Sequence, residues 1–217
     1  MSLGRIRCVL DLQSAQGESR FRGIGRHSLD LALAIVREAG DHEVWIALNG
    51  SFADSIADLR VKFDDLVPRN RIVSFDLPGH VAESDPANTW RRQASERLRE
   101  YFLARLAPDV VHVFSMFEGY CDDVVTSVGT YDSSFPVTAT FYDLIPLLLP
   151  KQYLYSPDVR EYYWRKAQWM KRADRLLAIS DHARREAIDY LHIPEGRVYN
   201  ISTGVGEQFR RIEISSD

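Results

Sequence analysis

The chain has 217 residues, of which 45% are hydrophobic, and its formal net charge is -4 at pH 7. This length and apolar content are sufficient to bury the core of one large domain. The acidic balance argues against a general nucleic-acid-binding protein, which would carry an excess of basic residues. No apolar run approaches the length of a membrane span, and Arg5 and Arg7 interrupt what would be the core of a signal peptide.

Short apolar runs alternate with longer segments of helical periodicity along the whole chain. The apolar runs are predicted strands, at residues 6–12, 44–48, 71–75, 110–113, 137–141, 175–179 and 197–201. The intervening segments are predicted helices, at residues 23–39, 52–61, 89–106, 124–128, 157–173 and 181–191. This alternation predicts an α/β fold with a Rossmann-like, doubly wound parallel sheet.

The long helix at 89–106 is predicted to have an apolar face and a charged face. The apolar face, expected to pack on the core, contains Trp90, Ala94, Leu98, Tyr101, Phe102 and Leu106. The charged face, expected to be solvated, contains Arg91, Arg92, Glu96, Arg97, Arg99 and Glu100.

The predicted strand 137–141 is followed directly by the polar pair Tyr142-Asp143. Pro146 and Pro150 oppose regular continuation, so an irregular loop is expected, anchored by Leu144, Ile145 and the leucines at 147–149. A strand that ends this way places polar groups at the carboxyl edge of the sheet, where ligands bind in open α/β folds. Asp143 is therefore either a ligand-binding residue or a cap of the loop, and the spacing alone does not decide.

A glycine turn, Gly23-Ile24-Gly25, precedes a predicted helix and is followed by Arg26. Glycines allow backbone N–H groups to approach a ligand, and a helix N-terminus with a nearby arginine favours phosphate. The alternative is a turn that only allows the helix to pack closely. The dinucleotide fingerprint is incomplete, because Ser28 occupies its last glycine position, so an oxidoreductase domain is not favoured.

The histidines do not fall at metal-ligand spacing, and the chain contains no Asp-x-Asp triplet. His112 lies within a strand and is expected to be a hydrogen-bonded core residue, whereas His27 beside the glycine turn is a candidate site residue. Ser180 is predicted to cap a helix directly after a strand, at a junction of the kind that faces ligands.

Residues 160–175 are predicted to form an aromatic and basic helix. This helix either contacts an anionic membrane or presents an ordinary core stripe, which would consist of Tyr162, Tyr163, Ala167, Met170 and Ala173.

Motifs spread over nearly the whole chain resemble the N-terminal domain of a family-4 retaining glycosyltransferase with the GT-B fold. They are Gly23-Ile24-Gly25-Arg26, the segments 108–112, 141–146, 173–180 and 193–198, and 204–209 with its Gly-Val pair. The resemblance is greatest to bacterial enzymes, often mannosyltransferases, that build O-antigen or other polysaccharides. Many members of this family have His where this chain has Tyr142, and Asp where it has Gly206.

The resemblance implies a division of labour between two domains. Residues 6–206 would form the acceptor-side domain, residues 1–5 an N-terminal extension or cloning remnant, and residues 207–217 the start of a linker to a C-terminal domain. That second domain would bind the nucleotide-sugar donor through a Glu-x7-Glu motif, and without it this chain is expected to be inactive.

The resemblance also implies a function, namely the transfer of a sugar such as mannose from a nucleotide-sugar such as GDP-mannose, without a metal or other cofactor, to a glycan or lipid-linked glycan. Roles follow for eight residues: Asp143 and Tyr142 in catalysis, Gly23, Gly25 and Arg26 on the donor-phosphate side, and Glu118, His27 and Ser180 on the acceptor side. A cytoplasmic location is expected, with contact to the inner face of the membrane through 160–175, and Cys8 and Cys121 reduced. The alternative is a non-enzymatic α/β module that binds a nucleotide, a sugar or a protein.

Overall fold

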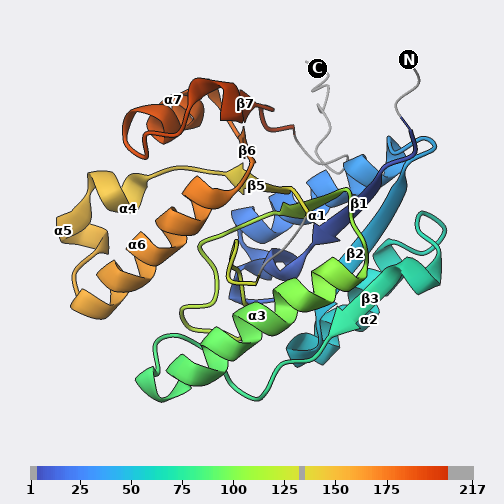
Figure 1. The fold of residues 1–217 in the computed structure, drawn as a ribbon, viewed down its shortest axis with the longest axis horizontal. Helices are drawn as coiled ribbons and strands as arrows, with labels where there is room; N and C mark the ends of the chain where they lie inside the picture. Colours follow the sequence, from blue (N-terminus) through green and yellow to red (C-terminus); the bar gives the residue numbers. More distant parts are fainter. Residues whose placement is uncertain (1–3, 132–134, 205–217) are drawn as a thin grey trace, which may run out of the picture.

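A computed structural model describes residues 4–131 and 135–204 of the chain, which form one parallel sheet flanked by helices (Figure 1). The sheet has seven strands in the order β3-β2-β1-β4-β5-β6-β7. In chain order the strands are β1 (Arg7–Asp11), β2 (Glu43–Asn49), β3 (Ile72–Phe75), β4 (Val110–Val113), β5 (Val137–Phe141), β6 (Arg175–Ala178) and β7 (Val198–Asn200). The prediction of a Rossmann-like, doubly wound parallel sheet is confirmed.

Seven α-helices connect these strands, together with short 3-10 turns. The helices are α1 (Gly23–Arg37), α2 (Ala53–Lys62), α3 (Thr89–Arg105), α4 (Ile145–Leu148), α5 (Pro150–Tyr153), α6 (Pro157–Arg172) and α7 (Asp181–Asp189). The 3-10 turns are η1 (Gln13–Ala15), η2 (Glu18–Phe21), η3 (Gly50–Phe52), η4 (Arg69–Arg71), η5 (Pro86–Asn88) and η6 (Glu195–Arg197).

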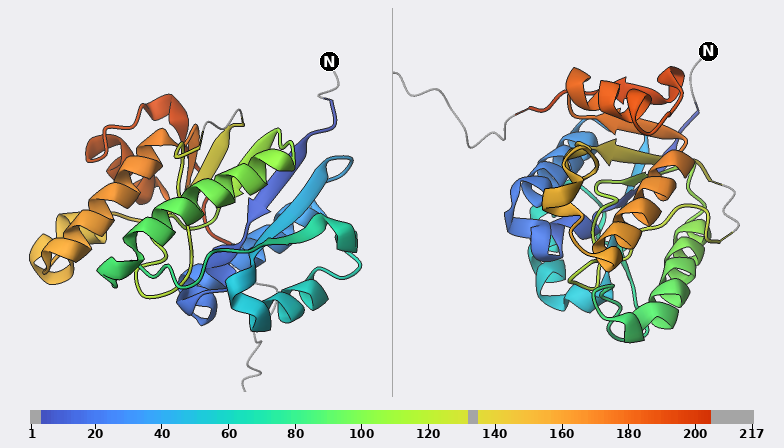
Figure 2. Two further views of the ribbon diagram at one scale, coloured as in Figure 1. Left: turned by 60° about the horizontal axis from the view of Figure 1, so that its bottom comes forward. Right: turned by 90° about the vertical axis from the view of Figure 1, so that its left-hand side faces the viewer.

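The two faces of the sheet bury separate apolar clusters because successive side chains of a strand point to opposite faces. Leu10 packs with α1 and α2 residues such as Ala32 and Leu59, whereas its neighbour Val9 packs in the cluster that contains Leu103 of α3 and Ala167 of α6. Figure 2 shows α1 and α2 on one side of the sheet and α3 and α6 on the other. Because the strands carry apolar side chains on both faces, helices must cover both faces of the sheet.

The face of α3 that packs on the protein is charged, contrary to the prediction. Trp90 is 65% exposed, and Leu98 and Tyr101 are also exposed. Glu96, Arg99 and Glu100 are buried instead. The periodicity was correct for a helix, but these charges have partners in the protein, which offset the cost of removing them from water.

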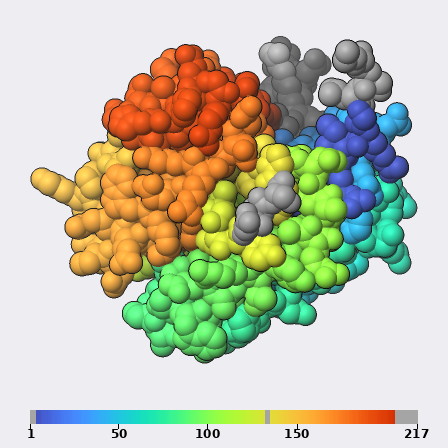
Figure 3. Space-filling view, in the orientation of Figure 1, coloured from blue at the N-terminus to red at the C-terminus, as the bar shows by residue number. Residues whose placement is uncertain are grey.

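Those partners explain a second difference, which concerns residues 124–128. No helix forms there, because the backbone of this segment bonds to buried side chains. The Val125 N–H donates to Gln13 Oε1 at 3.0 Å, Arg99 Nη1 donates to the Ser127 carbonyl at 3.2 Å, and the Ser127 hydroxyl donates to Glu100 at 2.6 Å. Figure 3 shows the chain that follows β4, in yellow-green, filling the space between α3 and α6.

Two proline-led turns of helix replace the irregular loop predicted after Asp143. They are α4 and α5, in which Pro146 and Pro150 occupy the first turn, where the missing N–H has no intrahelical partner to lose. Leu144 is fully buried as expected, whereas Ile145, Leu148 and Leu149 are exposed rather than anchored in the core. The residue before α2 is Phe52, which offers no side-chain cap, and Asn49 caps the preceding turn η3 by accepting the Ser51 N–H.

The aromatic helix α6 uses its apolar stripe as part of the core. Tyr162, Tyr163, Ala167, Met170 and Ala173 are all buried, as the core-stripe alternative predicted. Lys166 is buried on the same helix, where its Nζ donates to Thr126 Oγ1 at 2.6 Å and burial lowers its pKa to about 7. The aromatic side of α6 therefore belongs to the protein interior.

Candidate functional site

The strand order reverses between β1 and β4, which are neighbours in the sheet although β2 and β3 lie between them in the sequence. In open α/β sheets, ligands bind beyond the carboxyl ends of the strands at such a reversal. Here η1 and η2 follow β1, the segment that begins at Phe114 follows β4, and Tyr142 follows β5. The candidate site is therefore sought at this edge.

An aromatic cavity of about 290 Å³ lies at the β4 and β5 side of this edge. It is bounded by the start of α1, the chains that follow β4 and β5, and the helices α4 to α6. Its lining residues are Ile24, Ser115, Met116, Phe117, Tyr142, Asp143, Pro146, Tyr153, Leu154, Val159, Tyr162, Tyr163 and Met170. Concave, mostly apolar pockets with a few polar groups are the usual form of small-molecule sites.

Tyr142 joins this cavity to α1. Its hydroxyl lies 3.0 Å from His27 Nδ1 and 3.4 Å from the Ser28 hydroxyl, and the two rings of Tyr142 and His27 meet edge to face. Ser28 donates its proton to the Ile24 carbonyl at 2.7 Å, so toward Tyr142 its oxygen acts only as an acceptor. The donor between Tyr142 and His27 is set by the tautomer of His27. The sequence prediction that His27 and Tyr142 belong to one site is consistent with this contact.

Burial keeps both partners of this pair neutral at pH 7. It raises the pKa of Tyr142 to about 12 and lowers the pKa of His27, against a smaller opposite effect of the Asp30 carboxylate. A neutral His27 that accepts a proton at Nδ1 carries its own proton on Nε2. The pair is therefore a hydrogen-bonded unit without net charge at the N-terminal end of α1.

Asp143 lines the aromatic cavity and also caps the chain that follows it. Its Oδ1 accepts the Ile145 N–H at 2.9 Å, which is the loop-capping role considered from the sequence. The two roles are compatible because a carboxylate has two oxygens. The adjacent backbone is fixed by α7, since the Leu144 N–H donates to the buried Glu186 carboxylate at 2.8 Å.

Gly25 and Gly23 differ in their surroundings at the start of α1. A Cβ on Gly25 would overlap the backbone of Ser19 and Arg20, so the packing alternative holds for this glycine. The corresponding position of Gly23 faces open space, and both Gly23 and Arg26 are exposed. The first turn of α1 therefore offers backbone N–H groups and a cation to solvent at this edge.

Glu118 and Ser180 lie close to the sheet edge but do not line the aromatic cavity. Glu118 is buried and accepts hydrogen bonds from Ser19 and Ser115, each at 2.9 Å, and burial raises its pKa. It thereby ties η2 to the chain after β4. Ser180 is the cap of α7, where its hydroxyl accepts the Ala183 N–H at 3.1 Å, as predicted. Their roles toward an acceptor remain predictions.

Apart from Tyr142, the aromatic residues that line the cavity were not predicted as site residues. Phe117 stacks on Tyr163 with ring centroids 4.8 Å apart, and Tyr162 lies beside Tyr120 at 5.1 Å. The only signal in the sequence was the density of aromatic residues between 153 and 164. Helical periodicity assigned them to the core, and a residue can belong to the core and line a cavity at its edge.

Other kinds of site were considered in the same region. Among residues 4–131 and 135–204, no three or more His, Cys, Asp or Glu side chains gather as a candidate metal site. His112 is buried between two threonine hydroxyls, with Nδ1 2.8 Å from Thr138 and Nε2 3.0 Å from Thr140, as expected for a core histidine. No helix in the described part of the chain is long and apolar enough to cross a bilayer.

Comparison with known sequences places the chain among glycosyltransferases. Residues 21–209 match the family Glycosyltransferase Family 4. A serotype-specific mannosyltransferase WbdA of Escherichia coli is 37% identical over 210 residues, which are 96% of this chain and 25% of that protein. A second WbdA sequence from Escherichia coli is 36% identical over 188 residues, 86% of this chain and 23% of that protein. The chain thus spans about a quarter of the length of these relatives.

Solved structures agree on the fold. A glycosyltransferase from Rickettsia africae ESF-5 superposes with a TM-score of 0.50 at 12% identity, over 94% of this chain and 44% of that one. A protein described as a putative UDP-N-acetylglucosamine 2-epimerase from Listeria monocytogenes gives 0.55 at 12% identity, over 91% and 45%. At this identity the likeness concerns the fold alone, and it fits the expected half of a GT-B architecture.

Proposed function

This chain belongs to Glycosyltransferase Family 4, and we propose that it is the acceptor-side domain of an enzyme that transfers mannose from a nucleotide-sugar to a glycan or lipid-linked glycan with retention. The observation that carries the proposal is the 37% identity to a WbdA mannosyltransferase over 96% of this chain. GDP-mannose is the proposed donor. The family and the relatives do not favour the alternative of a non-enzymatic module.

The chemical task is to stabilise a sugar with oxocarbenium character and a departing diphosphate. The start of α1 supports a role of Gly23, Gly25 and Arg26 on the diphosphate side, because N–H groups and a cation favour the charge that develops there. Gly23 and Arg26 are exposed, whereas Gly25 is buried and lets the turn pack against Ser19 and Arg20. In this proposal the chain's own dipoles and cations act on the leaving group, and no metal takes part.

Asp143 and Tyr142 are the proposed catalytic residues. Both line the aromatic cavity, so a sugar placed there would meet the Asp143 carboxylate and the neutral Tyr142–His27 pair together. A carboxylate stabilises positive charge on the sugar, and the phenol and imidazole can bond its hydroxyls. Glu118, His27 and Ser180 are the proposed acceptor-side residues, and Glu118 is bonded to Ser115 of the cavity wall.

The proposed location is the cytoplasm, at the inner face of the membrane where a lipid-linked acceptor would be found. The exposed apolar side chains of α4 and α5 support such a contact better than α6 does. Ile145, Leu148, Leu149 and Tyr153 are all exposed and follow Asp143 in the chain. Co-sedimentation of the protein with anionic vesicles, with and without the Leu148→Ser/Leu149→Ser changes, tests this contact.

The experiment for the proposed function is a transfer assay with radiolabelled GDP-mannose and a manno-oligosaccharide acceptor, using the protein encoded by the complete gene. We expect Asp143→Ala to lower kcat/KM by about 100-fold or more while the fold survives, a loss typical of removing an electrostatic group from a site. Asp181→Ala, an exposed acidic residue in the first turn of α7, is the control. An unchanged kcat/KM in Asp143→Ala would remove this residue from the site, and no transfer by the unaltered protein would contradict the proposed function.

A further inference from the structure

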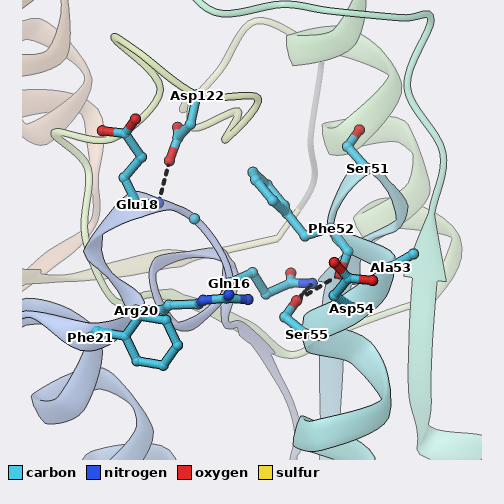
Figure 4. A pocket seen from close by; sticks show the side chains of 11 residues that line it. Gln16, Glu18, Arg20, Phe21, Ser51, Phe52, Ala53, Asp54, Ser55 and Asp122 are labelled. Carbon is cyan, nitrogen blue, oxygen red and sulfur yellow. Dashed lines mark hydrogen bonds between the residues drawn. The ribbon is translucent and has the colours of Figure 1, made fainter.

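A second hollow lies at the other side of the same sheet edge. Its volume is about 550 Å³, and it is bounded by the chain after β1, the start of α2 and Asp122 (Figure 4). Its lining residues are Gln16, Gly17, Glu18, Arg20, Phe21, Ser51, Phe52, Ala53, Asp54, Ser55 and Asp122. None of them lines the aromatic cavity. We call this hollow the polar cavity.

The walls of the polar cavity are fixed by buried polar contacts. Gln16 is buried and bonds the Asn49 backbone at both its N–H and its carbonyl, as well as the Ser55 hydroxyl at 3.1 Å. The Glu18 N–H donates to Asp122 Oδ2 at 2.7 Å. Gly17 is required for this approach, because a Cβ there would overlap the Asp122 carboxylate. A cavity held this way is formed before any ligand arrives.

The charge of the lining residues selects the class of ligand. Glu18, Asp54 and Asp122 supply three carboxylates, whereas Arg20 supplies one cation, whose guanidinium lies 4.5 Å from the centre of the Phe21 ring. This balance disfavours phosphates, nucleotides and anionic headgroups. A neutral ligand rich in hydroxyl groups instead gains charge-assisted hydrogen bonds from the carboxylates.

The aromatic side chains of the polar cavity further restrict the kind of ligand that fits it. Phe21 is 71% exposed, so its ring is accessible to a ligand, and Figure 4 shows Phe52 directed into the hollow from the start of α2. Aromatic rings offer flat apolar faces. A pyranose ring presents C–H groups on its faces and hydroxyls at its rim, so it matches a lining of aromatic rings and carboxylates.

The segment from Gln16 to Ile24 connects the two cavities. Gln16, Gly17, Glu18, Arg20 and Phe21 line the polar cavity, and Ile24 lines the aromatic cavity. Within this segment, Ser19 is bonded to Glu118, which is bonded in turn to Ser115 on the aromatic-cavity wall. A ligand that crossed this segment would reach both hollows.

We propose that the polar cavity binds neutral sugar units of the glycan acceptor that lie beyond the unit at which transfer occurs. This inference rests on the proposed function for its acceptor, but not for its ligand class. It assigns the enzyme a preference for acceptors long enough to reach from the aromatic cavity to the polar cavity.

The test measures binding of linear mannotetraose to the protein by isothermal titration calorimetry. We expect a Kd near about 1 mM and a loss of about tenfold, or 1.4 kcal/mol, in Asp54→Ala and in Phe21→Ala. Asp58→Ala is the matched control, because Asp58 lies exposed on the same helix as Asp54 but outside the cavity. Thermal unfolding of each variant shows whether the fold is intact. Absence of mannotetraose binding, or equal binding by all variants, would overturn the inference.

Kinetics separate this inference from the proposed function. With the protein from the complete gene, Asp54→Ala should raise KM for mannotetraose about tenfold and leave KM for a mannose monosaccharide acceptor and for GDP-mannose unchanged. If transfer occurs but KM is independent of acceptor length in both proteins, the polar-cavity inference is wrong while the proposed function holds. If mannotetraose binds as expected but nothing is transferred, the proposed function fails while the saccharide site remains.

Discussion

The two sides of the carboxyl edge of the sheet are built from different kinds of contact. At the β1 and β2 side, buried amides and charges hold the polar cavity, with Gln13 bonded to Asp11, to Asn49 and to the backbone of Val125. At the β4 and β5 side, stacked aromatic rings such as Phe117 and Tyr163 form the aromatic cavity. Polar contacts fix a single geometry because each donor needs its own acceptor, whereas aromatic packing mainly supplies buried area.

The largest expected effect comes from breaking the polar side. Arg99 is buried and donates to Asp11 through Nε at 2.7 Å and through its terminal nitrogen. Arg99→Leu would leave the Asp11 carboxylate buried without its cation, so we expect a loss of about 3–5 kcal/mol in the free energy of unfolding. Urea unfolding of the protein and of Arg99→Leu measures this loss. Arg97→Leu, on the exposed side of α3, should change this value by less than about 0.5 kcal/mol, and equal stability of the two variants would contradict the account.

The second effect is a pH dependence of the free energy of unfolding, which arises from His112 at the boundary between the two sides. Burial lowers the pKa of His112 on β4 to about 3, whereas the unfolded chain has its ordinary value near 6.5. Between these values the unfolded state binds a proton that the folded state does not, so the contribution is complete above about pH 6.5 and is lost as pH falls toward about 3. From pH 6.5 to 4.5 the stability lost in this way amounts to about 2 kcal/mol.

Unfolding of the protein and of His112→Asn across this range isolates the histidine from the carboxylates, which titrate in both proteins. We expect the pH slope of the variant to be shallower by about one proton. His192→Asn, which changes an exposed histidine, is the control and should retain the slope of the unaltered protein. Parallel slopes in the protein and in His112→Asn would show that His112 is not the group responsible.

The smallest effect concerns the aromatic side. Tyr142→Phe keeps the ring in the cavity but removes the hydroxyl that lies 3.0 Å from His27, so we expect kcat/KM for mannose transfer to fall about tenfold, or 1.4 kcal/mol. His27→Ala should give a similar loss, and the double variant should lose less than the sum, because both changes break one hydrogen bond. Strictly additive losses would show that the pair does not act as a unit.

The same contrast explains what could be predicted from the sequence. Apolar runs and helical periodicity were sufficient for the seven strands, for the start of α1 at Gly23 and for Tyr142-Asp143 at a strand end, because these depend on local pattern. The role of α3 was not predictable in this way. Its buried Arg99 is paired with Asp11, which lies 88 positions away in the sequence, and periodicity carries no information about such a partner.

The candidate site was predictable to a similar extent. Residues next to a strand end or a glycine turn, such as His27 and Asp143, could be named as candidates from local pattern, and the structure brings Tyr142 and His27 into contact across 115 positions. The polar cavity was missed, because Glu18, Asp54 and Asp122 come from three separate segments whose proximity is created by the parallel sheet. Likewise, no local signal indicated that Glu118 would be buried between two serines.

The central claim is that two neighbouring cavities at one sheet edge bind two parts of one glycan substrate. The most direct measurement is a titration of the ¹⁵N-labelled protein with mannotetraose, followed by amide NMR spectra. The account predicts shifts in two groups of amides, one at residues 17–21 and 51–55 and the other at residues 115–117 and 142–143. Shifts confined to one group would reduce the substrate site to a single cavity, and shifts elsewhere on the protein would contradict the account.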